Sequence, residues 1–121
     1  MNLPEEYIAR MRALPDADGY FSCLDEPPVR GVRVNTLKIS PSRFLSEGFL
    51  QTDGAVPWAE NCFYIKDEKP GKSLAFAAGL FYVQEPSAAC AAPLLDAKPG
   101  ERILDLCSAP GGKDTQLAAA M

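Results

Sequence analysis

Apolar positions recur with two different periods in the first third of the chain. Helical spacing near the N-terminus predicts an amphipathic helix over residues 4–14, with one apolar face made of Tyr7, Ile8, Met11 and Leu14. Between residues 29 and 38, the order "VRGVRVNTLK" alternates apolar and polar side chains, which predicts a strand with Val32 and Val34 on one face. Proline and turn-forming residues separate the two elements, so we expect a short connector over 15–28.

Capping and turn residues delimit the later elements. Ser40 and Pro41 are typical of a helix start and Gly48 of a helix end, which predicts a helix that turns Phe44 and Leu45 to the core. Further elements are expected in this order: a strand at 61–67, a short helix at 73–79, a strand at 80–84, a helix at 86–97 that Pro93 kinks or splits, a strand at 102–106, a glycine loop at 107–112 and a helix from 113.

The character of the sequence changes near residues 70–80. Before this point the chain mixes helices, strands and many turns, and after it helix, strand and helix alternate as they do in βαβ architectures. We therefore expect an α/β fold class with an α+β first domain over residues 1–75 and a second unit that begins at residues 76–121.

Composition excludes several classes of protein. No stretch approaches the ~18 apolar residues of a membrane span, and the N-terminus has no apolar signal core, so we expect a cytoplasmic protein. The chain has no histidine and no CxxC pair, which makes a metal site unexpected; its cysteines are Cys23, Cys62, Cys90 and Cys107. The first three are expected to be buried small hydrophobic residues. A net charge of −4 argues against non-specific nucleic-acid binding, although Arg30, Arg33 and Lys38 form a local basic cluster.

The glycine loop at the end of the chain is the candidate binding site. A phosphate-binding P-loop would need glycine at position 107 and Ser or Thr at 114, where the chain has Cys107 and Asp114. The dinucleotide spacing G-x-G-x-x-G is absent as well. A tight turn of small residues after an acid suits a methyl donor such as S-adenosylmethionine, whose carboxylate Lys113 could reach. A plain turn between a strand and a helix remains the alternative.

Three blocks of sequence, in one order, resemble a known family. The block "DLCSAPGGKDTQLA" is similar to motif I of the Sun/RsmF-type RNA cytosine-5 methyltransferases, "VRVNTLKIS" to an N-terminal block of that family, and "GLFYVQEPSA" to the block before motif I. The resemblance covers essentially the whole chain. Two positions depart from the family pattern, Ser108 and Asp114, and the negative charge of Asp114 puts affinity for the donor carboxylate in question.

The resemblance implies a fold, a cofactor and a partner. It implies an N-terminal RNA-binding domain followed by the start of a Rossmann-like methyltransferase domain that uses S-adenosylmethionine. Its donor-binding residues would be Cys107, Ser108, Ala109, Pro110, Gly111, Gly112 and Lys113. It implies RNA as the partner, with small-subunit ribosomal RNA as the first expectation, and transfer RNA or a non-catalytic RNA-binding module as alternatives. RNA contacts are expected from Arg33, Asn35 and Lys38.

The family's catalytic cysteines lie well downstream of motif I, and none of the four cysteines here matches their positions. We therefore expect an N-terminal fragment whose nucleophile lies beyond residue 121, with Cys107 in the donor loop and no catalytic role. The strand at 102–106 would lack its neighbours, so we also expect self-association through an exposed sheet edge or a poorly ordered end. Gln84 and Glu85 are expected to position the motif I strand, and Trp58, Phe63 and Tyr64 to pack in the core rather than stack on bases.

Overall fold

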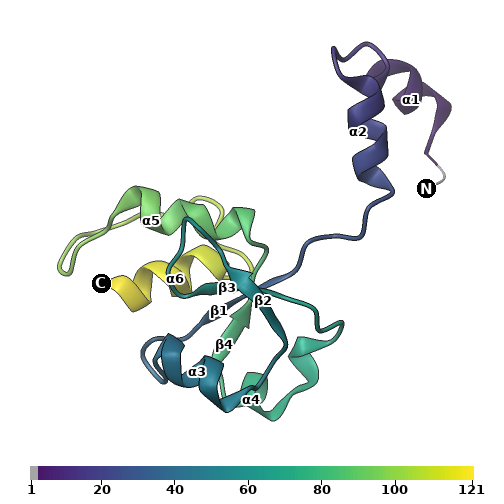
Figure 1. The fold of residues 1–121 in the computed structure, drawn as a ribbon. Helices are drawn as coiled ribbons and strands as arrows, with labels where there is room; N and C mark the ends of the chain where they lie inside the picture. Colours follow the sequence, from purple (N-terminus) through teal and green to yellow (C-terminus); the bar gives the residue numbers. More distant parts are fainter. Residues whose placement is uncertain (1–2) are drawn as a thin grey trace.

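The computed structural model describes residues 3–121, which fold around one four-stranded sheet (Figure 1). The strands lie in the order β2-β3-β1-β4, and every neighbouring pair is antiparallel. The elements run in this order: α1 (Glu5–Met11), α2 (Ala17–Leu24), β1 (Gly31–Val34), α3 (Pro41–Glu47), β2 (Thr52–Ala55), β3 (Cys62–Ile65), a 3-10 turn at Pro70–Lys72, α4 (Leu74–Ala77), β4 (Phe81–Val83), a 3-10 turn at Ser87–Cys90, α5 (Ala91–Leu95) and α6 (Gly112–Ala120).

Both faces of the central strand β1 are covered. α3 and α4 lie on one side of the sheet and α5 and α6 on the other (Figure 1). The main core lies on the first side, where Val32 and Val34 pack with residues of α3, α4 and the other strands: Phe44, Phe63, Ile65, Ala75 and Phe81. Arg33 points to the opposite face and is also buried, because α6 covers that face. The predicted alternation of β1 is therefore confirmed, but its polar face is not exposed to solvent.

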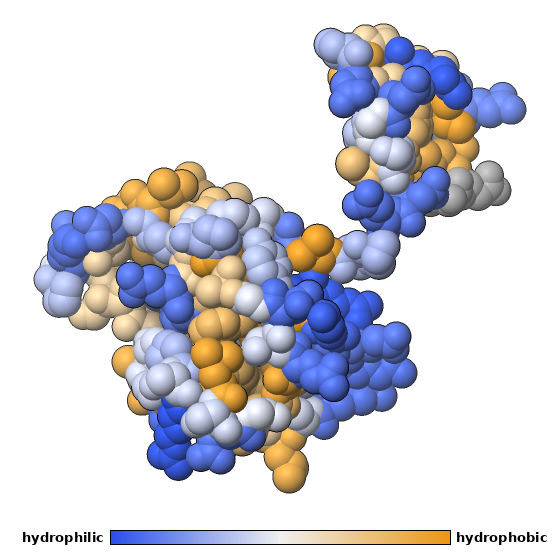
Figure 2. All heavy atoms as spheres, in the orientation of Figure 1, coloured by the Kyte–Doolittle hydropathy of each residue, from blue (hydrophilic) through white to orange (hydrophobic). Residues whose placement is uncertain are grey.

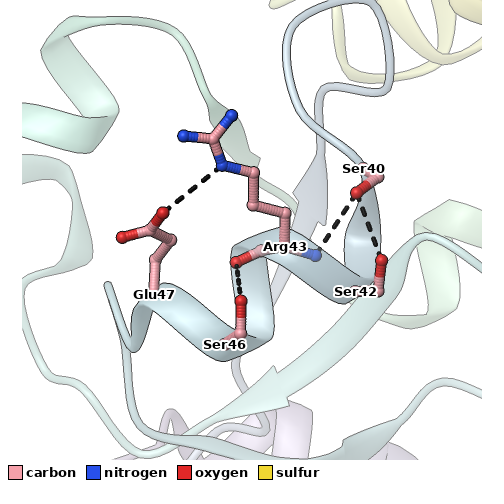
Figure 3. A network of polar contacts seen from close by, with 5 residues as sticks. All are labelled: Ser40, Ser42, Arg43, Ser46 and Glu47. Atoms are coloured by element: carbon pink, nitrogen blue, oxygen red, sulfur yellow. Dashed lines mark hydrogen bonds and ion pairs between the residues drawn. The ribbon is translucent and has the colours of Figure 1, made fainter.

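The helix predicted at 40–48 forms as α3. The Ser40 hydroxyl accepts a hydrogen bond from the Arg43 backbone N–H at 3.3 Å, and Gly48 ends the helix with a left-handed φ of 63° (Figure 3). These contacts satisfy backbone groups that a helix end leaves without partners. Phe44 is buried as predicted, whereas Leu45 is exposed.

Two expectations for the N-terminal half are wrong. The connector over residues 15–28 contains a helix, α2, which the Asp16 side chain caps by accepting a hydrogen bond from the Gly19 backbone N–H at 3.2 Å. The cap residue therefore outweighs the turn-forming composition of this segment. α1 and α2 lie apart from the sheet, and an extended segment after α2 leads into β1 (Figure 1). Cys23 lies on α2 and is exposed rather than buried.

The sheet crosses the predicted domain boundary. β4 pairs with β1, with Arg33 opposite Tyr82, so Phe81–Val83 belongs to the same sheet as the strands before residue 75. A strand that the sequence did not suggest, β2, forms one edge of this sheet. The predicted break near Pro93 is confirmed, since a 3-10 turn ends at Cys90 and α5 begins at Ala91.

The strand predicted at 102–106 does not form. These residues adopt no regular structure, and Leu104 and Leu106 are 81% and 86% exposed. A strand exists only through hydrogen bonds to a neighbour, and no strand of the described residues lies beside this segment. Apolar spheres also cover the region of α5 in Figure 2, where Leu94 is exposed.

Candidate functional site

The predicted glycine loop is a turn held by its own polar groups. The Gly111 backbone N–H donates to the Ser108 carbonyl at 2.5 Å, and Gly111 has a φ of 100°, a left-handed conformation that favours glycine. Before the turn, the Asp105 carboxylate accepts a hydrogen bond from the Cys107 N–H at 2.7 Å. Lys113 Nζ, from the first turn of α6, donates to the Cys107 carbonyl at 3.0 Å, so the start of the loop is joined to the helix that follows it.

The loop lies against β4 and the residues that follow it. The Tyr82 hydroxyl donates to the Pro110 carbonyl at 3.2 Å. A β-carbon at Gly112 would lie 3.5 Å from the Tyr82 ring, an ordinary van der Waals contact, so the start of α6 packs against this ring without requiring glycine at this position. Between loop and strand lies a pocket of about 190 Å³, lined by Tyr82, Val83, Gln84, Glu85, Ala88, Ser108, Ala109, Pro110, Gly112 and Lys113.

A buried polar network joins the sheet to the start of α6. Arg33 is 4% exposed; its Nη1 donates to Gln84 Oε1 at 2.7 Å and to the Gly112 carbonyl, and its Nη2 donates to Thr115 Oγ1 at 2.6 Å. Gln84 Nε2 in turn donates to Gln116 Oε1 at 3.1 Å. Buried polar groups are stable only when they are paired, so this network fixes how α6 packs on the sheet.

Burial changes the acidity of two groups on this side of the sheet. It lowers the pKa of Arg33, against the opposing effects of Cys62 and Tyr82, yet a guanidinium stays charged in proteins. Burial raises the pKa of the Cys62 thiol to about 11, and the positive charge of Arg33 offsets part of this rise. Cys62 is therefore a neutral thiol near neutral pH and a poor nucleophile.

Two carboxyl groups meet beside the loop. Desolvation raises the pKa of Asp114, interaction with Asp105 raises it further, and the charge of Lys113 opposes both effects. Asp105 Oδ2 is buried without a hydrogen-bond partner among residues 3–121. The geometry of the described residues gives Asp105 Oδ2 no donor, whereas a side-chain hydrogen bond with Asp105 contributes to the raised pKa of Asp114, so Asp105 Oδ2 is without a partner only while Asp114 is ionised. The cation beside this acceptor is Lys113, which contacts the Cys107 carbonyl.

Of the three residues predicted to contact RNA, Asn35 and Lys38 lie at one turn, and Arg33 is buried elsewhere. Asn35 Nδ2 donates to the Gly79 carbonyl at 2.9 Å, and Lys38 Nζ donates to the Ala78 carbonyl at 2.7 Å, so both bind the turn after α4. Arg33 is instead inside, bound to α6, which differs from the solvent-facing position that an RNA phosphate contact requires. Arg33 and Asn35 do line one pocket of about 310 Å³ between β4 and α6.

Sequence reasoning missed part of this network. The motifs alone did not indicate Thr115 and Gln116 as members of the network. A glutamine next to small and apolar residues, as in "TQLAAAM", is nevertheless a signal for a buried polar contact. Gln84 was expected to position the strand before the loop; it instead contacts α6, the helix after the loop. Phe63 is in the core as predicted, while Trp58 is half-exposed and its indole N–H donates to the Pro86 carbonyl at 2.7 Å.

Among residues 3–121 no helix is long and apolar enough to cross a membrane. The same residues contain no group of three or more His, Cys, Asp or Glu side chains placed to hold a metal ion.

Comparisons with known proteins agree over nearly the whole chain. A family model described as the N-terminal domain of 16S rRNA methyltransferase RsmF matches residues 3–86. Ribosomal RNA small subunit methyltransferase F of Klebsiella pneumoniae is 41% identical over 98% of this chain and 28% of its own length. The protein of the same name from Shigella dysenteriae is 36% identical over 98% of this chain and 27% of its own length.

Solved structures give the same result. A methyltransferase homologue from Pyrococcus horikoshii superposes with a TM-score of 0.73 at 33% identity, over 98% of this chain and 45% of that chain. A second solved chain superposes with a TM-score of 0.82 at 31% identity, over 98% of this chain and 28% of that one.

The mixed helix and antiparallel-sheet fold and these matches define the class: over nearly its whole length the chain is similar to methyltransferases and a methyltransferase homologue. The chain belongs to the RsmF family of 16S rRNA methyltransferases, and residues 3–86 match its N-terminal domain. It spans about 28% of the length of the Klebsiella relative.

Proposed function

We propose that this chain is part of an S-adenosylmethionine-dependent RNA cytosine-5 methyltransferase that acts on small-subunit ribosomal RNA. One observation carries the proposal: the three blocks that resemble the family meet at one place. Arg33 of the first block contacts Gln84 of the second, and both contact the glycine loop or the helix that follows it. Segments up to 82 residues apart in the chain therefore build one site.

The residues present suit part of a methyl donor. We assign donor binding to the loop that runs from Cys107 to Lys113. The buried, unpaired Asp105 Oδ2 could accept a hydrogen bond from the ammonium group of the donor, and Lys113 could pair with its carboxylate. The start of α6 adds backbone N–H groups that attract an anion. Because the pocket beside the loop is about 190 Å³, smaller than the roughly 300 Å³ of a complete small-molecule site, it suits the amino-acid end of the donor.

S-adenosylmethionine would supply an electrophilic methyl group. Methylation at carbon 5 of cytosine needs a cysteine thiolate to attack carbon 6 of a base that has left its stack. We assign this role to none of the four cysteines. Cys62 is buried with a pKa of about 11, and Cys23 lies on α2, away from the loop. Cys107 contributes backbone groups to the loop, through its N–H to Asp105 and its carbonyl to Lys113.

We propose that the RNA contacts come from the N-terminal part of the chain, with Asn35 and Lys38 as the first candidates. Both lie at the turn after β1, and Lys38 covers Gly79. Small-subunit rRNA is the substrate that the relatives' names indicate, and transfer RNA is the alternative. A comparison of binding to 16S rRNA fragments and to tRNA, at one fixed salt concentration, separates the two.

Three further expectations stand as proposals. We place the N-terminal domain before the loop and the start of a Rossmann-like domain at the loop and α6, with the boundary after β4 because that strand completes the first sheet. A cytoplasmic location follows from ribosomal RNA as the proposed substrate.

Self-association through the exposed segment that contains Leu104 and Leu106 is tested by light scattering of wild type and of a Leu104→Ser/Leu106→Ser double variant.

Titration with S-adenosylmethionine tests the proposed function directly. We expect a chain of the relatives' full length to bind the donor saturably by calorimetry, and this chain, whose pocket suits only the amino-acid end of the donor, to bind it weakly. In both, bound donor should protect Cys107 from alkylation while Cys23, which is also exposed, stays reactive. Cys23 is therefore an internal control for general loss of thiol reactivity. Equal alkylation of Cys107 with and without saturating donor would contradict donor binding at this loop. RNA binding without any donor binding would favour the non-catalytic RNA-binding module.

A further inference from the structure

We infer that Arg33 is a positioning residue for the glycine loop: its guanidinium fixes the first turn of α6, and the loop with it, against the sheet. One consequence, tighter donor binding, rests on the proposed function. The other consequence, an ordered loop, does not. The RNA-contact expectation for Arg33 is replaced by this role, because its side chain is 4% exposed and its donors are used within the chain.

Three successive carbonyls of the loop each accept a hydrogen bond, two from residues of the sheet and one from α6 itself. The Tyr82 hydroxyl donates to the Pro110 carbonyl, the Thr115 hydroxyl donates to the Gly111 carbonyl at 2.6 Å, and Arg33 donates to the Gly112 carbonyl. Arg33 also contacts the two residues that supply the other donors. Its guanidinium lies 5.3 Å from the centre of the Tyr82 ring and donates to Thr115 Oγ1 at 2.6 Å.

The direction of these carbonyls determines the direction of the loop amides. In a planar trans peptide the N–H points opposite to the carbonyl. The N–H groups of Gly112 and Lys113 therefore point away from the partners of the Gly111 and Gly112 carbonyls. These are the groups at a helix start that an anion would meet, so Arg33 sets how they are presented.

The geometry requires arginine rather than another cation. The planar guanidinium reaches acceptors on two elements at once, Gln84 beyond β4 and Thr115 on α6. A lysine ammonium has three donors, but all three are on one nitrogen atom and cannot span both. A buried cation is tolerated only when hydrogen bonds satisfy its donors, so losing the acceptors on α6 would leave Arg33 underpaired.

Four variants of the 121-residue chain test the inference. Arg33→Met removes all guanidinium contacts, and Arg33→Lys keeps the charge. Thr115 is exposed, and Thr115→Val removes the hydroxyl that accepts from Arg33. Arg43→Met is the matched control, because Arg43 is an exposed arginine on α3 that pairs with Glu47 at 3.3 Å (Figure 3). Amide hydrogen exchange of residues 107–120, circular dichroism of the fold and donor affinity are measured for each.

For Arg33→Met we expect exchange in residues 107–120 to rise by on the order of tenfold while the amides of β1 and β3 keep their protection. Donor affinity should fall by on the order of tenfold. Thr115→Val should also raise the exchange of residues 107–120 and lower donor affinity, but by less. Arg33→Lys should lose less protection and less donor affinity than Arg33→Met. Arg43→Met should match wild type in both measurements. Recovery by lysine at an unchanged sheet fold separates positioning from a general loss of stability.

Wild-type exchange over 107–120 in both Arg33→Met and Thr115→Val would overturn the inference. If Arg33→Met does not fold, Thr115→Val alone decides the question. If a chain of the relatives' full length binds no S-adenosylmethionine, the proposed function fails, and the exchange measurement on the 121-residue chain still decides whether Arg33 orders the loop.

Discussion

Arg33 Nη2 on β1 donates a hydrogen bond to Thr115 Oγ1 on α6 at 2.6 Å, although 82 positions separate the two residues in the sequence. The contact joins the first and last family-like blocks of the chain. It shows that the sheet of the N-terminal domain and the glycine loop form one packed unit. Changes in the sheet are therefore expected to reach the candidate donor site.

The core on the α3 side of the sheet depends on Phe44. This ring is 1% exposed and lies 5.6 Å from the Phe49 ring and 5.7 Å from the Phe81 ring. Phe44→Ala leaves a cavity where both rings lose contacts, so we expect the free energy of unfolding to fall by about 3–5 kcal/mol in urea titration. The neighbouring change Leu45→Ala, at an exposed position, should cost less than about 1 kcal/mol. Equal losses in the two variants would contradict this packing.

The start of α3 depends on the Ser40 hydroxyl, which caps the Arg43 N–H (Figure 3). Ser40→Ala removes this partner, and we expect a loss of about 1 kcal/mol in unfolding free energy, while Ser40→Asp should keep most of it. Ser46→Ala is the control, since Ser46 donates to the Arg43 carbonyl from an exposed position inside the helix. It should change stability by no more than about 0.5 kcal/mol. A larger loss from Ser46→Ala than from Ser40→Ala would show that capping is not the cause.

The thiols should react in an order set by burial. The pKa of Cys62, about 11 against an ordinary 9.0, lowers its thiolate fraction by about a hundredfold at neutral pH. We expect Cys23 and Cys107, both exposed, to react quickly with a thiol reagent and Cys62 to react only after unfolding. Cys23→Ser and Cys107→Ser should each remove one fast equivalent. Cys90 is partly exposed and is expected to react at an intermediate rate, so a full fast equivalent that survives both changes together would contradict this order.

The pKa of Asp114 should depend on its two charged neighbours. Carboxyl NMR titration should place it above the ordinary 3.8, and Asp105→Asn should lower it toward that value, because one raising influence is removed. Lys113→Met should raise it further. A pKa for Asp114 that is the same in all three proteins would show that these side chains do not interact.

The raised pKa of Asp114 also predicts the sign of a stability change with pH. Below 3.8 the carboxyl is protonated in both the folded and the unfolded chain, and no penalty arises. As the pH rises past 3.8, the unfolded chain loses its proton first, so the contribution of this group to stability falls until the folded pKa is passed. Relative to wild type, Asp114→Asn should therefore become more stable as the pH rises through this window, as measured by thermal unfolding.

Local signals in the sequence determined much of the secondary structure. Ser40, Pro41 and Gly48 specified α3 because caps and left-handed glycines act within one turn of chain. The alternation around Val32 and Val34 specified β1, and Gly111 and Gly112 specified the turn before α6. Asp16 carried a comparable capping signal for α2, which the turn-rich composition around it obscured.

Only the tertiary structure decided where the polar residues of these elements lie. Arg33 reads as a solvent-facing strand residue, yet α6 covers its side of the sheet, and burial then requires the acceptors on Gln84 and Thr115. Residues 102–106 read as a strand, yet a strand needs a hydrogen-bonded neighbour, and the described chain places none beside them. Periodicity and capping depend on nearby residues and are visible in the sequence, whereas burial and strand pairing depend on segments far apart in the chain.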